Sequence, residues 1–394
     1  MAHSGQERVT GVTQMNAQDG GVKTAFFVIA DISGYTKFMA ETAIEHAKGI
    51  LESLFGDLLP AVRSPLKISG MQGDAIFAYA FETDVMTKQF ILDFSEQLYC
   101  VFARSKEKMI LNTGCPCDAC STVDGLELKI VVHHGDCVIQ KTGDREELAG
   151  QDVITAFRLL KNKVKERTGM DAYTLISCDA LRAMDMKEYF VESEFHTEEI
   201  EHIGEVEYVV RDMRAAWDRR RTSERTFVEL GDDLLMDEWI IPLPVSPEIA
   251  FTICTRPDMR GEWLGANRVE LLNTNNGKIE SGTTYHCYHG DAIFPFEIVD
   301  WYPGEYATGR YNLPMGLSML ETDELVEMGE GTMVKIRFTT PKSPKLMGKI
   351  MAGKVRKNLL GIIGPDKENR IRKMTALAEK LAAETKAAEA ASLA

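Results

Sequence analysis

The sequence predicts an α+β protein with two domains joined by a short connector, and two patterns support this prediction. From Phe26 to about Ile176, short apolar runs alternate with segments whose apolar residues recur at helical spacing. Beyond Phe227, short strand-like runs follow one another between turn residues, and a long helical segment follows them. The first pattern is typical of a mixed sheet with helices on one face, and the second of an antiparallel sheet.

The composition narrows the class of protein. The chain has 394 residues, 44% of them hydrophobic, and a formal net charge of −15. This charge argues against a nucleic-acid binder, because phosphate backbones attract basic surfaces. We expect no transmembrane span, because no uncharged apolar stretch of about 18 residues occurs. The polar, Gly-rich start lacks the apolar core of a signal peptide, so we expect a disordered arm over residues 1–22 and a cytoplasmic protein.

We expect the first domain over residues 23–210. The apolar run Phe26–Ala30 predicts its first strand, and Lys37–Leu59 predicts the helix after it. A Gly-rich turn over Gly70–Gly73 separates two further apolar runs and predicts a hairpin. The other expected elements are strands Leu66–Ser69, Ala75–Phe81, Leu126–His133 and Tyr173–Ser177, and helices Asp84–Ser105 and Asp152–Lys165.

A connector rich in Arg and Asp is expected over 211–226, before a second domain over 227–363. Ser246 is placed to cap a helix over Pro247–Cys254. The expected strands of this domain are Asp237–Ile241, Arg268–Asn273, Gly282–Tyr288, Phe296–Tyr302, Tyr306–Leu313, Ser318–Glu327 and Thr332–Thr339.

Two helices are expected after the last strand. The first covers Ser343–Leu360 and ends before Gly364-Pro365, because proline rarely continues a helix. The second is a tail over 364–394, rich in Ala, Lys and Glu, which is expected to be a solvated or partner-packing helix.

A carboxylate at the tip of the first strand is the most informative functional feature. The apolar run ends in Asp31, and small and hydroxyl residues then lead into a helix. This order places an acid beside the free N–H groups of a helix start, as a site for a cation and phosphate oxygens requires. Asp74 belongs to the next hairpin, so two strand-borne aspartates could hold two divalent ions at one triphosphate. The alternatives without a ligand are a helix N-cap for Asp31 and a turn acid for Asp74.

Four motifs in order resemble those of class III nucleotide cyclases over about residues 25–180. The tract Phe27–Thr36 resembles the opening motif, and Gly73-Asp74-Ala75 resembles the second metal-binding hairpin. Ile130–Gly135 is similar to the strand with a His and a Gly, and Gly150–Leu159 to the helix with an Asn and an Arg. The resemblance implies a ferredoxin-like mixed sheet and, since such sites form between two protomers, a homodimer.

The resemblance also implies roles for individual residues. Asp31 and Asp74 would bind two Mg²⁺ or Mn²⁺ ions, with the backbone carbonyl of Ile32 as a further ligand. Arg158 would stabilise charge on the reacting phosphate of a nucleoside triphosphate. The backbone amides that would cradle the phosphates are those of Ser33, Gly34, Tyr35 and Thr36.

Two positions depart from the cyclase pattern. Ile154 stands where the ribose-orienting Asn is expected, one turn before Arg158, and Gly70 stands at a base-selecting position. Glu147, at the second base-selecting position, could accept from a guanine edge. Loss of one preorganised hydrogen bond to a transition state typically costs about 10²–10³ in rate. An active cyclase and a nucleotide-binding domain without turnover are therefore both possible. Arg158 could instead lie on a solvated helix face or in an ion pair. Asn162, one turn beyond Arg158, could substitute for the missing Asn.

Three thiols lie close together in an expected Cys-rich insertion over 114–121. Cys115, Cys117 and Cys120 could wrap one soft ion, for which Zn²⁺ is the usual candidate. The second Cys pair of a typical zinc motif is missing, so redox-active thiols and unliganded thiols are alternatives. The cluster is also similar to Cys-rich insertions in a bacterial subgroup of cyclase-like domains. The candidate fourth ligands are Cys100, Cys137, His133 and His134.

The second domain resembles the START/polyketide-cyclase-like (SRPBCC) superfamily in the order of its elements and in the tracts Trp239–Glu248 and Asp258–Trp263. The resemblance implies a helix-grip fold, in which a curved antiparallel sheet wraps around a long helix and leaves an apolar cavity for a lipid or other hydrophobic ligand. His286 and His289 are three residues apart, so on a regular strand they point to opposite faces. The expected cavity residues are Trp263, His286 and Trp301, and His289 is a further candidate.

Three functions fit these features. The first is signalling by a domain that binds, and in its enzyme version cyclises, a nucleoside triphosphate, coupled to a domain that senses a hydrophobic ligand. The second is a catalytically degenerate nucleotide-binding module attached to the same ligand-binding domain. In the third, the first domain only dimerises and the second domain binds or transfers lipid.

Overall fold

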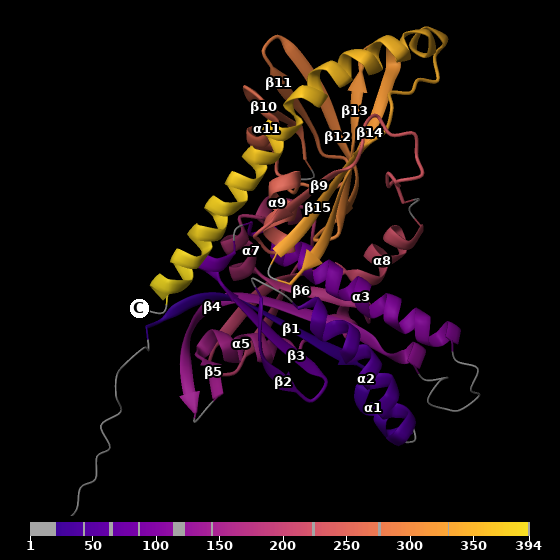
Figure 1. Ribbon diagram of the computed structural model, residues 1–394. Coiled ribbons are helices and arrows are strands. Elements are labelled where there is room, and N and C mark those ends of the chain that lie inside the picture. The colour runs from indigo at the N-terminus through magenta and orange to yellow at the C-terminus, as the bar shows by residue number, and fades with distance from the viewer. Residues whose placement is uncertain are drawn as a thin grey trace, which may run out of the picture.

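The computed structural model describes residues 21–41, 44–62, 66–85, 87–112, 123–142, 145–222, 225–274, 277–329 and 331–392. Within these ranges the chain forms two β-sheets, one in each half of the sequence. In Figure 1, the first sheet and its helices lie at the bottom, and the second sheet stands above them. The predicted α+β class is confirmed.

The first sheet is mixed and has the strand order β2-β3-β1-β4-β6-β8-β7, with β5 paired to the C-terminal part of β4. β4 and β6 run parallel, and the other neighbouring strands are antiparallel. The strands are β1 (Lys23–Ser33), β2 (Lys67–Gln72), β3 (Ala75–Phe81), β4 (Glu127–Thr142), β5 (Arg145–Ala149), β6 (Tyr173–Ser177), β7 (Phe195–Ile200) and β8 (Gly204–Asp212).

Helices cover both faces of this sheet, whereas the sequence predicted helices on one face. The side chains of β1 explain the difference, because both of its faces are apolar. Phe26 and Val28 enter one core with α2, α3 and α7, and Phe27 and Ile29 enter another with α5 and α6. The helices are α1 (Tyr35–Glu41), α2 (Ile44–Ala61), α3 (Phe90–Asn112), α5 (Gln151–Leu159), α6 (Val164–Thr168) and α7 (Cys178–Met184).

The predicted connector over 211–226 belongs largely to the first domain. β8 extends to Asp212, and Met213–Thr222 form helix α8. Met213 is fully buried, and the indole N–H of Trp217 donates to Glu107 on α3 at 3.0 Å. The sequence pattern missed this packing and the strands β7 and β8, because many charged residues on their outer faces obscure the apolar alternation.

The second sheet is antiparallel, as predicted, with the order β10-β11-β12-β13-β14-β15-β9. Ser246 caps α9, since its hydroxyl accepts from the backbone N–H of Ile249. The elements are β9 (Trp239–Leu243), α9 (Pro247–Thr255), α10 (Pro257–Leu264), β10 (Arg268–Asn273), β11 (Thr284–His289), β12 (Ala292–Tyr302), β13 (Tyr306–Leu313), β14 (Leu317–Met328), β15 (Gly331–Phe338) and α11 (Leu346–Ser392).

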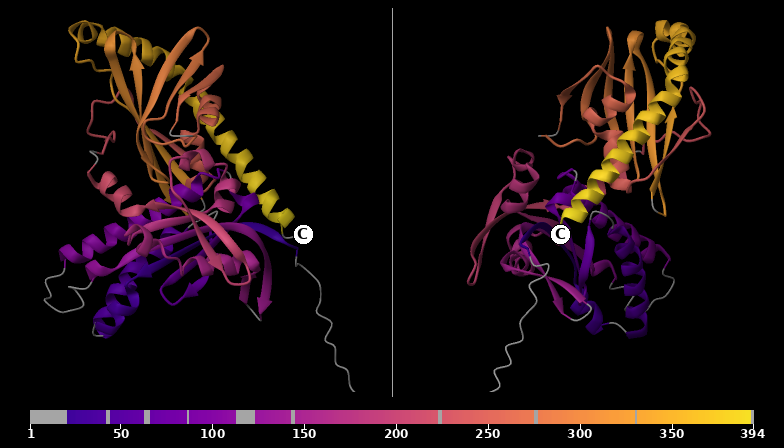
Figure 2. Two further views of the ribbon diagram at one scale, coloured as in Figure 1. Left: turned by 180° about the vertical axis from the view of Figure 1, so that it is seen from behind. Right: turned by 60° about the vertical axis from the view of Figure 1, so that its left-hand side comes forward.

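One continuous helix, α11, replaces the two helices that the sequence predicted around Gly364-Pro365. A proline inside a helix costs about 3 kcal/mol, because it removes an N–H and crowds the preceding turn. Buried side chains on both sides of the proline, including Leu359 and Met374, offset this cost by packing in the core of the second domain. The C-terminal part of α11 descends to the first domain, and the helix contacts the turn Glu82–Asp84 there (Figures 1 and 2).

The two domains meet through paired polar contacts. The side-chain amide of Gln89, just before α3, accepts from the backbone N–H of Ile279 at 2.9 Å and donates to its carbonyl at 2.7 Å. Beside this pair, the buried Lys278 places its ammonium 3.3 Å from the Asp93 carboxylate on α3. These contacts tie α3 to the segment between β10 and β11.

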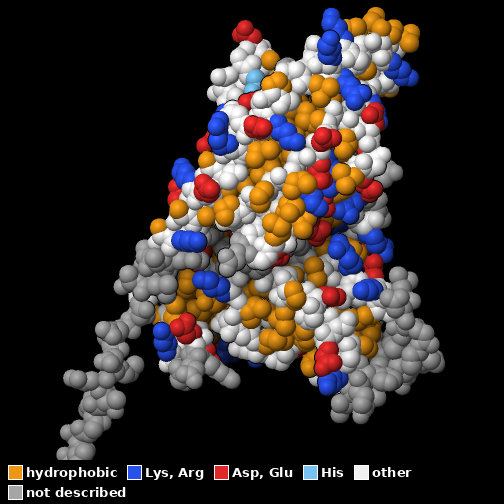
Figure 3. Space-filling view, viewed as in Figure 1, with side chains coloured by type: hydrophobic (Ala, Val, Ile, Leu, Met, Phe, Trp, Pro, Cys, Tyr) orange, Lys and Arg blue, Asp and Glu red, His pale blue; other side chains and the backbone are white. Residues whose placement is uncertain are grey.

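The surface is mixed in character. On the face shown in Figure 3, charged side chains of both signs are interspersed among apolar ones over both domains. Exposed apolar side chains of the first domain include Ile68, Met71 and Ile154, at 42%, 44% and 54% exposure. In the described ranges, no helix is long and apolar enough to cross a membrane.

Candidate functional site

The carboxyl groups of Asp31 and Asp74 come together at one end of the first sheet. Asp31 lies near the end of β1, opposite Ala75 on β3 and Lys129 on β4. Asp74 lies in the turn between β2 and β3, and the backbone N–H of Ile32 donates to its carboxylate. Two acids that are 43 positions apart (74 minus 31) therefore share one site.

The charges around this pair act in opposite ways on a bound cation. Burial raises the pKa of Asp74, and the negative charge of Asp31 raises it further. The ammonium of Lys129 lies 2.9 Å from Asp31 Oδ2 and supplies a positive charge on one side. In the described part of the chain, no three His, Cys, Asp or Glu side chains gather as a metal site. Two neighbouring carboxylates are nevertheless a partial ligand set for a hard divalent cation, which takes its other ligands from water or phosphate.

A tight turn after Asp31 leads directly into α1. Gly34 has a φ of +86°, and a Cβ at this position would lie 2.7 Å from the carbonyl oxygen of Gly125. No larger residue therefore fits without movement of the backbone. α1 begins at Tyr35, and Phe38 N–H donates to the Gly34 carbonyl at 2.9 Å. The N–H groups that precede this bond have no partner within the helix.

A hollow of about 530 Å³ contains the two positions that the cyclase resemblance assigns to base selection. Gly70 on β2 and Glu147 on β5 both line it, together with Phe77 and Phe157. The two aromatic rings pack edge to face with their centroids 4.9 Å apart. Because Gly70 has no side chain, the charged groups of this hollow are the carboxylates of Glu146 and Glu147.

The helix that would supply the transition-state residues presents them to solvent. Arg158 is exposed in the last turn of α5 and makes no ion pair with a described residue. Ile154, one turn earlier, is 54% exposed. Asn162 does not replace the missing Asn, because its amide donates to a backbone carbonyl at 2.6 Å and accepts from the Tyr173 hydroxyl at 2.9 Å.

The His-Gly segment of β4 has a packing role. His133 is buried, and its Nδ1 lies 2.8 Å from the Ser177 hydroxyl. A Cβ on Gly135 would lie 2.3 Å from the Asp152 side chain, so only glycine fits there. The Asp152 carboxylate accepts from the backbone N–H of Asp136 at 2.7 Å. These contacts hold the start of α5 against β4 and so position the helix that carries Arg158.

The predicted zinc ligands Cys115, Cys117 and Cys120 lie outside the described residues. Among the candidate fourth ligands, Cys137 is buried, and burial raises its pKa to about 11. Burial also raises the pKa of Cys100. Both thiols therefore favour the protonated form, which binds metals poorly. The zinc site stays a prediction.

The second domain has an apolar hollow of about 300 Å³ between its sheet and α11. Cys287 and His289 from β11, Tyr311 from β13, and Leu359 and Ile363 from α11 belong to its wall. A hollow with this lining suits an apolar ligand of small-molecule size.

Of the candidate cavity residues of the second domain, His289 lines this hollow, and Trp263, His286 and Trp301 lie elsewhere. His286 and His289 fall on opposite faces of β11, and His289 is the one that lines the hollow. Trp263 is fully buried and donates its indole N–H to the Ile253 carbonyl at 3.0 Å. Trp301 lines a different cavity, at the boundary between the domains. The sequence identified apolar and aromatic candidates, but the faces on which they lie depend on the strand register.

A buried charge cluster lies next to this hollow. Arg260 of α10 donates to the carboxylates of Glu321 and Asp323 on β14, and all three residues are at most 4% exposed. Arg260 also donates to the hydroxyl of Tyr311, which lines the hollow, at 2.9 Å. Burial raises the pKa of Asp323 well above its usual range, and the charge of Glu321 adds to the effect. The cluster therefore favours a proton on Asp323 and a net charge near zero.

Sequence reasoning missed Lys129 and the Arg260 cluster. Lys129 becomes a partner of Asp31 because of the register between β1 and β4. This register cannot be predicted from either segment alone. A signal for the cluster was present, since Glu321 and Asp323 alternate within a predicted strand and so share one face. Two acids on the inner face of a core strand predict a buried cation or bound protons that offset their charge.

Comparison with known proteins identifies relatives for part of the chain. Residues 51–168 match a protein family of unknown function, DUF2652. The uncharacterized protein Rv2561/Rv2562 of Mycobacterium tuberculosis is 34% identical over 99 residues. This match covers 25% of the chain and 46% of that protein, so the chain spans less than half the length of this relative.

Solved structures of nucleotide cyclases are similar to about half of the chain. The guanylyl cyclase Cya2 is 15% identical, with a TM-score of 0.37, over 49% of this chain and 94% of that chain. The adenylyl cyclase CyaB from P. aeruginosa is 15% identical, with a TM-score of 0.38, over 49% of this chain and 96% of that one. The catalytic core of a rhodopsin-guanylyl cyclase in complex with ATPalphaS is 15% identical, with a TM-score of 0.34, over 50% of this chain and 98% of that one.

Proposed function

We propose that the first domain binds a nucleoside triphosphate together with Mg²⁺ or Mn²⁺ at Asp31 and Asp74. The observation that supports the proposal is the convergence of these two carboxylates beside the N–H groups that start α1. The metal would neutralise phosphate charge, with the Ile32 carbonyl as a further ligand. The backbone N–H groups of Ser33, Gly34, Tyr35 and Thr36 would donate to phosphate oxygens.

The base would enter the hollow lined by Gly70 and Glu147. A carboxylate accepts hydrogen bonds, and guanine offers neighbouring N–H donors on one edge, so Glu147 favours guanosine triphosphate. Phe77 and Phe157 offer apolar surface to the base.

A homodimer would complete the site in the enzyme version of this proposal. Arg158 is exposed and without an ion pair among the described residues, so it is free to reach a phosphate bound by a second copy. The exposed apolar side chains Ile68, Met71 and Ile154 would gain a covering surface in such a dimer.

The second domain would bind a hydrophobic small molecule or lipid in the hollow between its sheet and α11. α11 supplies part of that wall through Leu359 and Ile363, and the same helix contacts Glu82–Asp84 of the first domain. A ligand that shifts α11 would therefore act directly on the first domain.

The alternative is a first domain that binds nucleotide without turnover, or that only dimerises. Two observations favour it. The Lys129 ammonium already lies 2.9 Å from the carboxylate of Asp31, where a metal would compete with it. Ile154 stands at the position of the ribose-orienting Asn and has no group that forms a hydrogen bond.

Incubation of the purified chain with each nucleoside triphosphate and Mn²⁺ separates these functions. The enzyme version predicts a cyclic product that Asp31→Ala abolishes, and the binding version predicts micromolar affinity in calorimetry without product. Asp171→Asn is the matched control, because Asp171 is an exposed acid paired with Lys165 on the same domain. Bound lipid in the native protein, with no nucleotide binding under any condition, would contradict the proposal and leave only a dimerising role.

A further inference from the structure

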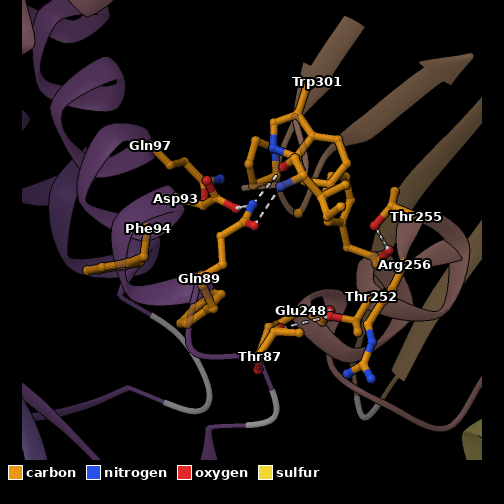
Figure 4. A pocket seen from close by; sticks show the side chains of 15 residues that line it. Thr87, Gln89, Asp93, Phe94, Gln97, Glu248, Thr252, Thr255, Arg256 and Trp301 are labelled. Carbon is orange, nitrogen blue, oxygen red and sulfur yellow. Dashed lines mark hydrogen bonds between the residues drawn. The ribbon is translucent and has the colours of Figure 1, made fainter. Parts of the chain in front are cut away.

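A cavity between the two domains contains polar atoms without partners. It encloses about 90 Å³ and lies between α3 of the first domain and α9 and β12 of the second. In Figure 4, Asp93 and Gln97 of α3 line one side, Thr252 and Thr255 of α9 line the other, and Trp301 lies above. Its aromatic wall residues are Phe90, Phe94, Phe251 and Trp301.

Glu248 is the first unpartnered group. It lies in the first turn of α9, but the hydroxyl of Ser246 caps that helix. Glu248 is 7% exposed, and its Oε1 has no hydrogen-bond partner among the described residues. Burial raises its pKa to about 8. A buried carboxyl without a partner is costly, so a group that enters the cavity and donates to Glu248 Oε1 would lower that cost.

The other charged groups of the wall have partners within the chain. Asp93 is paired with Lys278 at 3.3 Å and accepts from Gln89 at 2.9 Å. Arg256 is paired with Asp258 at 2.7 Å and points its guanidinium there. No charged group of the described wall therefore neutralises Glu248.

Trp301 is the second unpartnered group. Its indole Nε1 is buried and has no acceptor among the described residues. Its ring packs edge to face on Phe251, with the centroids 4.7 Å apart. An indole N–H donates only, so the missing partner is an acceptor such as an oxygen. Aromatic walls beside a carboxylate also favour a cation.

The volume limits the size of the occupant. A cavity of about 10–15 Å³ holds one water, and one of about 150 Å³ binds benzene. The 90 Å³ found here lies between these values, so roughly three to five non-hydrogen atoms fit.

We propose that this cavity binds a small organic cation of the amino-alcohol type. Its ammonium would donate to Glu248, and its oxygen would accept from the indole N–H of Trp301. Both domains supply the wall, and the Gln89–Ile279 pair lies beside it, so the occupant would stabilise the domain boundary. The site shares no residue with the nucleotide site, so it stands independently of the function proposed for that site.

Calorimetry on the full chain at pH 7 tests the proposal with ethanolamine, ethylamine and ethylene glycol as probes. Ethanolamine carries both the ammonium and the hydroxyl oxygen, so we expect it to bind at least about fivefold more tightly than ethylamine, which lacks the oxygen. Ethylene glycol lacks the ammonium, so we expect no binding. Because Glu248 is largely protonated at this pH and ethanolamine is already a cation, binding should release about one proton per ligand. Titration in two buffers of different ionisation enthalpy measures that proton.

Two variants and a control separate the contributions. Glu248→Gln keeps the shape of the side chain and should abolish both binding and proton release. Trp301→Phe should keep ethylamine binding and lose the advantage of ethanolamine. Glu262→Gln, at an exposed acid on α10, should match the wild type. Bound ethanolamine should also slow hydrogen exchange of the Ile279 amide, which donates to Gln89.

Three results would overturn the proposal. The first is no ethanolamine binding up to about 10 mM. The second is equal binding by wild type and Glu248→Gln. The third is no difference between ethanolamine and ethylamine in the wild type, and this test does not depend on whether any variant folds.

Discussion

The two domains hold pairs of acids in opposite ways. In the first domain, Asp31 and Asp74 lie at the end of the sheet, partly exposed, and the charge of Asp31 raises the pKa of Asp74. In the second domain, Glu321 and Asp323 lie within β14, at most 4% exposed, and share the guanidinium of Arg260. The second pair has a fully buried cation, whereas the first pair is partly exposed and its Asp31 is paired with Lys129 at 2.9 Å. The two pairs therefore differ in their position along the strand and in their exposure to solvent.

The largest effect on stability is expected when Arg260, the cation that the second pair of acids shares, is removed. Arg260→Met leaves two buried acids without a counter-charge, so we expect a loss of about 3–5 kcal/mol in the free energy of unfolding. Urea unfolding at pH 7 measures it. Arg268→Met is the matched control, because Arg268 makes an exposed ion pair with Glu270 that contributes less than about 1 kcal/mol. A fully stable Arg260→Met variant would show that the cluster does not need its cation.

Glu248, a third buried acid of the second domain, should make the stability of that domain depend on pH. Burial raises the pKa of Glu248 from 4.5 to about 8, so the folded protein holds this proton more tightly than the unfolded chain does. The stabilisation from this proton is complete below the unfolded pKa and is lost as pH rises through the folded pKa. From pH 5 to pH 9, we expect the wild type to lose roughly 4 kcal/mol relative to Glu248→Gln. Parallel stability curves in urea at the two pH values would contradict this account.

Substitution in the first pair, Asp31 and Asp74, should not lower the stability of the protein. Asp74→Asn removes a carboxyl whose pKa is raised by burial and by Asp31, so the free energy of unfolding should stay equal or rise by up to about 1 kcal/mol. The affinity for Mn²⁺ should fall by at least about tenfold, because one of two carboxylate ligands is lost. Urea unfolding and Mn²⁺ titration by electron paramagnetic resonance measure the two effects. A loss of several kcal/mol in stability would make Asp74 a structural turn acid.

The smallest effect is expected at Lys129, whose ammonium lies 2.9 Å from Asp31. Lys129→Met removes a cation that competes with the metal, so Mn²⁺ affinity without nucleotide should rise by a factor of about two to five. The same Mn²⁺ titration gives the result. A weaker Mn²⁺ affinity in this variant would mean that Lys129 orients Asp31 for the metal.

Local features of this chain could be predicted from the sequence, and features that depend on register could not. Tyr173–Ser177 and Tyr306–Leu313 are strands with the predicted bounds, because each combines apolar or β-branched residues between turn signals. The helix break at Gly364-Pro365 was wrong, because packing along α11 outweighs the local cost of proline. The pairing of Lys129 with Asp31 depends on how β1 and β4 align, and no local pattern contains that information.

The same limit applies to the candidate cavities. The opposite orientation of His286 and His289 follows from their spacing alone, but the face that meets α11 does not. Trp301 was predicted to line the cavity of the second domain, but it lines a cavity between the domains, where Gln89 and Ile279 bring α3 to the second domain. Contacts between domains leave no periodic signal in either segment.

Calorimetric binding of guanosine triphosphate, with and without Mn²⁺, tests most directly whether Asp31 and Asp74 act together as a metal–nucleotide site. The wild type, Asp31→Asn, Asp74→Asn and the double variant form one cycle. We predict that Mn²⁺ strengthens binding in the wild type, that either single change removes this dependence, and that the double variant loses little more. Binding that is equal with and without Mn²⁺, or that neither substitution changes, would contradict the account.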